Sequence, residues 1–249
     1  MTFDVAADAY DRLMGRYSRR LAPGFADFAG PSGTVLDVGC GPGALTAELV
    51  ARVGADRVVA VDPSEPFVAA ARARFPGVSV RRAPAESLPF EDGAVDAALA
   101  QLVVHFMSDP VGGVREMARV TRADGVVAAC VWDMGRSPLT PFWRAARELA
   151  PGVEGEGQRP GTREGQLEEI FHQAGLHDVS ATTIAVDVEH ETFDDWWEPF
   201  TLGVGPVGAY YTKLDEDDRA ALRRRCNELL GNGPFSIPSR VWAARGTAA

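Results

Sequence analysis

Short apolar runs and amphipathic segments alternate along the first half of the chain. The apolar runs have the length and composition of buried strands, and they cover residues 35–38, 57–62, 78–82, 94–101 and 126–132. Between them, apolar residues recur every three or four positions, as on helices that cover a sheet, in residues 44–53, 65–75 and 110–120. This alternation predicts an α/β fold in which helices flank a parallel sheet.

The pattern changes after residue 138. A loop rich in glycine and proline fills residues 151–161. Alternating apolar and polar residues then indicate a sixth strand at 179–190 and a seventh at 235–245. The stretch between these two strands, 191–232, reads as a helical insert rich in aromatic residues.

Helical segments therefore stand on both sides of a strand-rich centre. Residues 8–30 carry apolar side chains at helical spacing ahead of the first strand. We expect a single domain, 1–249, built on a doubly wound sheet of seven strands. Its core is 31–135, capped by the N-terminal helices of residues 1–30 and by the insert at 191–232.

Three glycines directly follow the first strand. Gly39, Gly41 and Gly43 let the backbone turn sharply because they have no Cβ, and a helix begins at once at Ala44. The free N–H groups of that helix are thus delivered to the carboxyl end of the strand, which is where doubly wound folds bind ligands. Cys40, inside the loop, is more simply explained as a small apolar filler than as a nucleophile.

The glycine loop fits two classes of cofactor. Gly39-x-Gly41-x-x-Ala44 matches the dinucleotide-binding fingerprint, and Asp62 lies about 20 residues on, where an acid that binds ribose belongs. Asp37 opposes a dinucleotide, because a carboxylate two residues before the first glycine would repel a pyrophosphate. A cofactor with a cationic head group removes that conflict.

The acid and glycines of residues 37–43 resemble motif I of the class I S-adenosylmethionine-dependent methyltransferases, whose pattern is acid-x-Gly-x-Gly-x-Gly. Residues 83–90 are similar to a second stretch of that family, which ends in Glu-x-Leu-Pro-Phe. The resemblance covers roughly 34–132 and is to the small-molecule enzymes typified by ubiquinone and menaquinone biosynthesis. It implies a Rossmann-like sheet of order 3-2-1-4-5-7-6 with strand 7 antiparallel, S-adenosylmethionine as cofactor and S-adenosylhomocysteine as product.

The resemblance also implies roles for single residues. In that family the acid after the second strand accepts hydrogen bonds from the ribose, and the residue that ends the fourth strand lies beside the methionine part of the cofactor. Pro84 stands where an acid commonly binds adenine, so adenine recognition passes to the Ala85 backbone or to Glu86. The expected cofactor contacts are Arg16, Asp37, Gly39, Cys40, Gly41, Gly43, Asp62, Pro63, Ala85, Glu86 and Gln101.

We expect the substrate to bind beneath the two caps, residues 1–30 and 191–232. In related methyltransferases an N-terminal helix folds over the cofactor, which makes Tyr10, Arg16 and Tyr17 candidates to reach its carboxylate or to close the site. The aromatic insert as a whole is expected to wall a small-molecule pocket, although any single ring is better explained by packing of the cap. The candidate pocket residues are Tyr17, Trp132, Trp143, Trp196, Trp197, Tyr210 and Tyr211.

One histidine is a candidate general base. His105 follows the fourth strand by four residues, and the ordinary pKa of histidine lies near neutrality. Its neighbours Phe106 and Met107 favour packing as the simpler explanation, and Tyr210 is a second candidate. Methyl transfer itself needs no metal.

Charge and composition narrow the classes of partner. With 35 acidic and 25 basic residues the net charge is −10, which works against DNA or RNA as substrate. Neither a signal peptide nor an apolar run of membrane-spanning length is apparent, so we expect a cytoplasmic protein without membrane insertion. Its 3 cysteines lack the spacing of a disulfide framework or a zinc site, and the oligomeric state stays open.

Three functions compete on this evidence. The first is transfer of a methyl group to a small organic acceptor by in-line displacement. The second is an NAD(P)-dependent oxidoreductase, which the dinucleotide fingerprint favours and the lack of a Tyr-x-x-x-Lys pair opposes. The third is a non-catalytic module that binds S-adenosylmethionine, whose cap would present a protein surface in place of a pocket.

Overall fold

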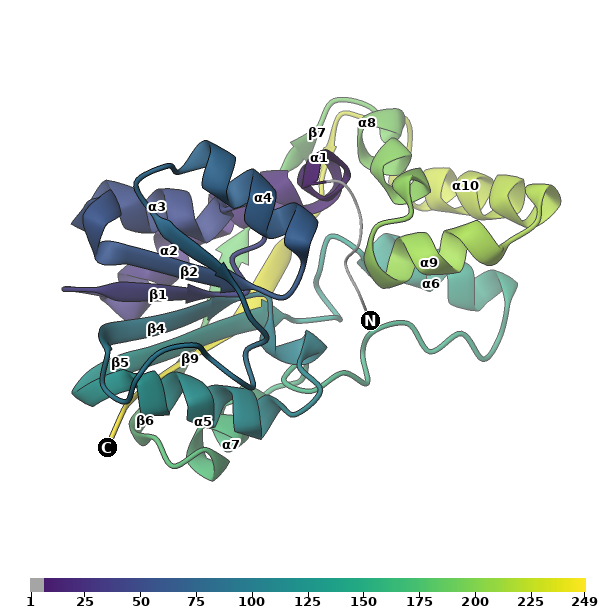
Figure 1. Cartoon of the computed structure of the whole chain (residues 1–249). Helices are drawn as coiled ribbons and strands as arrows, with labels where there is room; N and C mark the ends of the chain where they lie inside the picture. The colour runs from purple at the N-terminus through teal and green to yellow at the C-terminus, as the bar shows by residue number, and fades with distance from the viewer. Residues whose placement is uncertain (1–6) are drawn as a thin grey trace.

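A computed structural model describes residues 7–249 of the chain, so the first six residues of the expected cap at 1–30 lie outside the described part. Seven strands form one sheet in the order β3-β2-β1-β4-β5-β9-β6 (Figure 1). Its members are β1 (Val35–Val38), β2 (Val58–Asp62), β3 (Ser79–Arg82), β4 (Val95–Gln101), β5 (Thr121–Trp132), β6 (His177–Val186) and β9 (Ser239–Thr247). With β9 as the seventh strand, the expected order is confirmed.

Strand directions also agree with the expectation. The first five strands run parallel, and β9 lies antiparallel between β5 and β6. All four residues of β1 are buried, as in a central parallel strand covered on both faces. The strand β5 begins at Thr121, five residues before the expected start, because the pairing with β4 shifts register between Val95 and Ala97 and takes in the turn before Val126.

Helices cover both faces of the sheet (Figure 1). On one face lie α2 (Arg16–Ala29), α3 (Ala44–Val53) and α4 (Glu65–Arg74); on the other lie α5 (Pro110–Val120) and α7 (Gln166–Gln173). Each face has its own cluster of buried apolar side chains. Among residues 7–249, none of the helices combines the length and the apolar character needed to cross a membrane.

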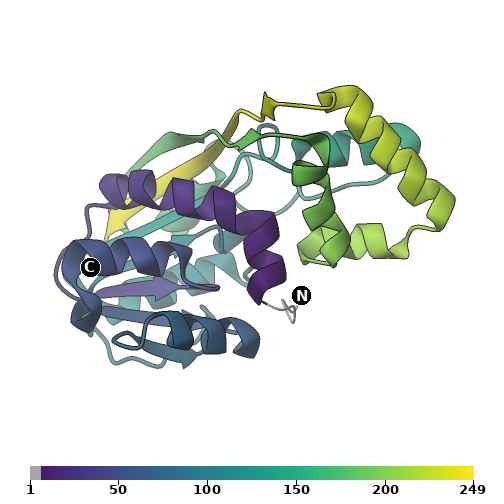
Figure 2. The same ribbon diagram turned by 90° about the horizontal axis from the view of Figure 1, so that it is seen from above.

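The N-terminal helical segment is continuous. The short helix α1 (Ala7–Tyr10) passes through a π-helical turn, Asp11–Gly15, into α2, which stops at Gly30 with φ of 62°. Figure 2 shows this segment crossing the sheet and pointing its first turn toward the helices of residues 193–230. The expected helix at 8–30 therefore brings its first residues to the carboxyl edge of the sheet.

A second lobe stands beyond that edge (Figures 1 and 2). It contains α6 (Thr140–Leu149), α8 (Phe193–Trp197), a 3-10 turn (Glu198–Leu202), α9 (Gly205–Lys213) and α10 (Glu216–Leu230). We call this lobe the cap. The helix α6 packs against α10, so the cap draws on residues well before the expected insert.

The two strands that flank the insert are shorter than expected. β6 ends at Val186, and residues Glu189–His190 form a separate strand, β7, that pairs with β8 (Phe235–Ser236). Pro238, just before β9, has no N–H to donate to a ladder. The alternating patterns at 179–190 and 235–245 therefore each span two strands, one in the main sheet and one at the base of the cap.

Candidate active site

A cleft opens where the glycine loop meets the carboxyl edge of the sheet. We call it the glycine-loop cleft; it encloses about 1100 Å³, open solvent included. Gly39 lines it with φ of 70°, and a Cβ there would lie 2.5 Å from the side chain of Val103. The N–H groups of Gly39 and Cys40 both donate to the Val61 carbonyl, at 2.8 and 2.9 Å. The loop thus needs glycine for both conformation and space.

Asp62, at the tip of β2, connects the loop to the next helix. One carboxylate oxygen accepts from the Gly41 N–H at 2.9 Å, and the other accepts from the Ser64 N–H at 2.8 Å. Burial raises the pKa of Asp62 to about 6. Asp62 and Pro63 both line the glycine-loop cleft, and each carboxylate oxygen keeps a lone pair for a ligand.

Asp37 lies deeper than expected. It is 1% exposed, does not line the cleft, and accepts a hydrogen bond of 2.6 Å from the hydroxyl of Thr46 in the first turn of α3. Burial raises its pKa to about 7. Cys40 and Gly43 are also absent from the lining: the Cys40 thiol donates to the Gly41 carbonyl, and Gly43 packs against Phe75. These three residues shape the loop from behind.

The floor of the cleft is the end of β4. Gln101 lines the cleft there, and its Nε2 donates to the Ser18 carbonyl at 3.1 Å. Its Oε1 is buried and has no hydrogen-bond partner among the described residues. The next residue, Leu102, has φ of 64°, a conformation that costs a bulky residue roughly 1–3 kcal/mol and tends to occur at functional sites.

Three expected cofactor contacts lie elsewhere. Glu86 accepts from the Ser108 N–H at 2.7 Å and from its hydroxyl at 2.8 Å, hydrogen bonds that keep the pKa of Glu86 below its ordinary value despite partial burial. Ala85 is buried, and neither residue lines the cleft. Arg16 instead makes a two-pronged ion pair with Asp195 of α8, at 2.7 and 2.8 Å. The side chains of Glu86 and Arg16 thus each bind a partner that is remote in sequence.

Sequence reasoning missed much of the cleft wall. The residues not selected for it are Ser64, Glu65, Phe67, Arg82, Leu102, Val103 and Phe106. Tyr10, weighed only as one of three candidates, lines the cleft as well. Two of them could have been predicted from their place in the chain, because Arg82 ends β3 and Leu102 follows β4, at the edge of the sheet where this fold binds ligands. The contribution of Phe67 depends on how α4 packs, which no local pattern reveals.

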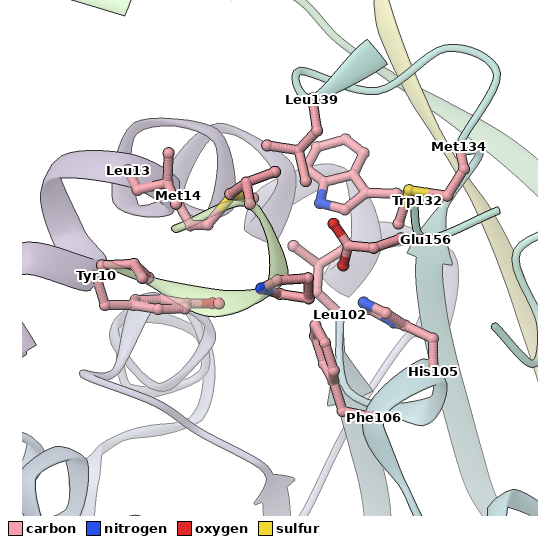
Figure 3. Close-up of a pocket in the computed structure, with 14 residues that line it drawn as sticks. Tyr10, Leu13, Met14, Leu102, His105, Phe106, Trp132, Met134, Leu139 and Glu156 are labelled. Carbon is pink, nitrogen blue, oxygen red and sulfur yellow. The ribbon is translucent and has the colours of Figure 1, made fainter. Parts of the chain in front are cut away.

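A second hollow, which we call the apolar pocket, adjoins the cleft beneath the cap (Figure 3). It holds about 430 Å³ of empty space, open solvent included. Its lining comes from five separate segments and consists of Tyr10, Leu13, Met14, Leu102, His105, Phe106, Trp132, Met134, Leu139, Glu156 and residues 204–207. Tyr10, Leu102 and Phe106 also line the glycine-loop cleft, so the two hollows share a wall.

Few polar atoms reach the apolar pocket. His105 Nδ1 and Trp132 Nε1 are buried without a hydrogen-bond partner in the described part of the chain. Burial, with a contribution from the charge of Arg159, lowers the pKa of His105 to about 3, so its ring is neutral near pH 7. Glu156, 3% exposed, is the acidic residue of the lining, and burial raises the pKa of its carboxyl.

Most of the expected aromatic wall is packed inside the cap. Trp132 does line the apolar pocket, whereas Tyr17, Trp143, Trp196, Trp197, Tyr210 and Tyr211 do not. Trp196 and Trp197 pack against Phe193, Phe142 and Phe200 to form the interior of the cap. The insert reaches the pocket through residues 204–207, which are the N-cap and the first turn of α9. Valine and proline side chains, not aromatic rings, form that part of the wall.

Two of those aromatic residues hold other parts of the site. The Trp143 indole N–H donates to Glu156 at 3.1 Å, and the Tyr17 hydroxyl is 2.8 Å from His190 Nε2. Both rings are buried, and each hydrogen bond satisfies the polar atom of the buried ring. Trp143 acts on the pocket from behind Glu156.

Comparison with known proteins agrees with this geometry. Residues 36–129 match the family described as methyltransferase domain. A probable S-adenosylmethionine-dependent methyltransferase of Mycolicibacterium smegmatis is 33% identical over 177 residues, which are 66% of this chain and 66% of the relative. An uncharacterized methyltransferase of Mycobacterium tuberculosis is 38% identical over 135 residues, 53% of this chain and 52% of that protein. The chain thus spans about half to two thirds of the length of these curated relatives.

A solved structure shares the fold of this chain. The YcgJ protein of Bacillus subtilis superposes with a TM-score of 0.59 at 18% identity, over 91% of this chain and 97% of that one. At this level of identity the likeness concerns the fold alone. Sequence match, sheet order and glycine loop together show that the chain belongs to the class I S-adenosylmethionine-dependent methyltransferases.

Proposed function

We propose that this protein transfers a methyl group from S-adenosylmethionine to a small, largely apolar organic acceptor, by in-line displacement. The observation that carries the proposal is the wall that the glycine-loop cleft and the apolar pocket share, made by Tyr10, Leu102 and Phe106. A donor in one hollow and an acceptor in the other would meet at the end of β4. Proximity and alignment of this kind account for much of the acceleration of a displacement reaction.

The residues of the cleft suit the cofactor of the family. Asp62 offers carboxylate oxygens to vicinal ribose hydroxyls, and the glycine loop allows close approach of the backbone. The buried, unpartnered Oε1 of Gln101 could accept a hydrogen bond from the cofactor's ammonium group. When bound, the cofactor supplies a methyl group on a sulfonium centre and leaves as S-adenosylhomocysteine.

The apolar pocket supports a small acceptor. Its lining is mostly aliphatic and aromatic, so it would exclude water from the reacting centre and favour dispersal of charge. His105 would orient the acceptor or fill space, since a group with a pKa of about 3 has little tendency to take a proton. Tyr210 does not line the pocket, which argues against it as base.

The two competing functions receive less support. Membership of the methyltransferase family disfavours a nicotinamide-dependent oxidoreductase. A hollow beneath the cap, in place of a closed protein surface, disfavours a non-catalytic module. We further propose a cytoplasmic enzyme that acts on neither nucleic acid nor membrane; the net charge of −10 supports the exclusion of nucleic acid.

Calorimetric titration with S-adenosylmethionine, and with NADH and NADPH in parallel, tests the proposal. We expect S-adenosylmethionine alone to bind. Asp62→Ala removes the acceptor for ribose and for the Gly41 N–H, and should weaken binding at least tenfold, about 1.4 kcal/mol.

Asp56→Ala is the matched control, because Asp56 is an exposed carboxylate near the opposite end of β2. It should leave the affinity unchanged. Binding of a nicotinamide nucleotide without S-adenosylmethionine would contradict the proposed function. Equal affinity in Asp62→Ala and wild type would show that the cofactor binds elsewhere.

A further inference from the structure

Glu156 is a buried acid in an otherwise apolar hollow. It comes from the loop at 151–161, which has neither helical nor strand periodicity, and it is 3% exposed. Figure 3 shows its carboxyl group pointing between the side chains of Trp132 and His105. Buried carboxylates are costly unless they are hydrogen-bonded, so this one calls for a partner.

The described residues satisfy Glu156 only in part. One carboxylate oxygen accepts from Trp143 Nε1 at 3.1 Å. The other oxygen is 3.8 Å from Arg159 Nε, too far for a hydrogen bond but close enough to offset part of the charge. A carboxylate can accept about four hydrogen bonds, so this one has capacity left for a donor within the apolar pocket.

The same wall also carries a donor without an acceptor. Trp132 Nε1 is buried and has no partner in the described part of the chain. An indole N–H is a donor only, so it needs an acceptor atom on whatever fills the pocket. Glu156 and Trp132 together require a group that can both donate and accept.

A hydroxyl group meets both requirements. It can donate to the Glu156 carboxylate and accept from the Trp132 indole N–H. An ammonium group has donors only, which would leave Trp132 Nε1 unsatisfied, and it would lie near the positive charge of Arg159. A pure hydrocarbon would leave both groups without a partner.

We infer that Glu156, with Trp132, selects acceptors that carry a hydroxyl group on an apolar, ring-sized frame. The inference rests on the proposed function only in naming this ligand as the methyl acceptor. The binding preference itself can be measured without any methyl transfer. Glu156 would thus be a specificity-determining residue contributed by a loop outside the sheet.

The test uses three probes that share a tolyl group: p-cresol, toluene, and 4-methylbenzylamine, which is a cation at neutral pH. Each is titrated into the full-length protein saturated with S-adenosylhomocysteine, and again without it, and its dissociation constant is read from NMR shifts of the indole N–H signals. We expect p-cresol to bind about tenfold more tightly than either of the other probes.

Two variants and a control complete the design. Glu156→Gln keeps an acceptor for Trp143 but loses the charge, so the preference for p-cresol should fall about fivefold or more. Trp132→Phe keeps a ring and removes the N–H, and should lower the preference as well. Glu154→Gln, an exposed carboxylate on the same loop, should leave the preference unchanged.

The outcomes separate the inference from the proposed function. A preference for p-cresol that persists in Glu156→Gln overturns the inference, as does equal binding, or no binding, of all three probes to the wild type. Failure of S-adenosylmethionine to bind overturns the proposed function, yet the preference of the pocket can still be read in the titration without S-adenosylhomocysteine.

Discussion

Two buried carboxylates stand at the carboxyl edge of the sheet. Asp37 accepts from Thr46, and Asp62 accepts from two backbone N–H groups, but burial still raises their pKa values to about 7 and about 6. The two carboxylates also lie close to each other, so the negative charge of Asp62 adds to the increase in the pKa of Asp37. The loop is therefore built around acids that resist ionisation, a situation that a cationic ligand nearby would relieve.

This arrangement predicts an unusual pH dependence for Asp37→Asn. The pKa of Asp37 is about 7 in the fold against an ordinary 3.8, so the unfolded chain loses this proton first as pH rises, and this residue then favours unfolding. Asn keeps an acceptor for Thr46 and cannot ionise. Relative to wild type, the variant's free energy of unfolding should rise by on the order of 3 kcal/mol between pH 4 and pH 7.

Urea unfolding at a series of pH values measures this difference. Asp56→Asn, which removes an exposed carboxylate, serves as the control and should run parallel to the wild type. Parallel profiles for Asp37→Asn and wild type would mean that Asp37 ionises normally in the fold.

His105 should remain neutral across the physiological range. Burial lowers its pKa to about 3, so its ring should not take up a proton between pH 8 and pH 5. Nitrogen-15 NMR of the imidazole, with the signal assigned through His105→Asn, reads the protonation state directly. A titration centred near the ordinary value of 6.5 would restore His105 as a candidate base.

At the scale of elements, the N-terminal helices are fastened to the cap by a small polar network. Arg16 of α2 pairs with Asp195 of α8 and donates to His190 Nδ1 at 3.0 Å, while Tyr17 meets the other ring nitrogen of the same histidine. The hydrogen bonds from Arg16 keep the pKa of Asp195 below its ordinary value. The helix α2 thus meets β7 and α8, two neighbouring elements that are more than 150 residues away from it in sequence.

A double-mutant cycle on Arg16→Ala and Asp195→Ala should give a coupling energy of about 1 kcal/mol in urea unfolding. The pair is bidentate and only about a third exposed, which places it above an ordinary surface ion pair. The matched control is the cycle on Arg12→Ala and Glu198→Ala, a pair that joins the same parts of the chain at 3.5 Å but is more than half exposed. Equal coupling in both cycles would contradict the special role of Arg16.

Elements were the part of the fold that the sequence predicted best. The positions of the strands and the site at the glycine loop follow from local patterns, because a buried strand, a glycine turn and a helix start are each recognisable within a few residues. The order of the strands was implied by the family resemblance. Glu86 and Arg16 were assigned to the cofactor on family resemblance, and the structure gives both to remote partners. No local sequence pattern indicates that Glu156 is part of the site, because its burial depends on how a loop folds over α6.

At the scale of the whole molecule, the two hollows differ in what encloses them. The glycine-loop cleft is lined by residues of the sheet core and by Tyr10, with none from the insert at 191–232. The apolar pocket adds residues 204–207 and the loop at 151–161. The cofactor would therefore contact one lobe, and the acceptor would contact both.

Hydrogen exchange should reveal this division. S-adenosylhomocysteine alone should slow amide exchange in residues 39–41 and 62–67, and should leave residues 205–230 of the cap within experimental error of the free protein. Mass spectrometry of peptic fragments resolves these segments. Protection spread evenly over both lobes would show that the cofactor site extends into the cap.

The short β7–β8 pair determines which part of the chain can change during evolution without disturbing the sheet. Because Glu189–His190 and Phe235–Ser236 lie side by side, the segment between them leaves and rejoins the body of the protein at almost the same place. Lineages could lengthen, shorten or exchange that segment without displacing β9 or its neighbours in the sheet. The chemistry of the donor would then be inherited unchanged while the range of acceptors evolves on its own.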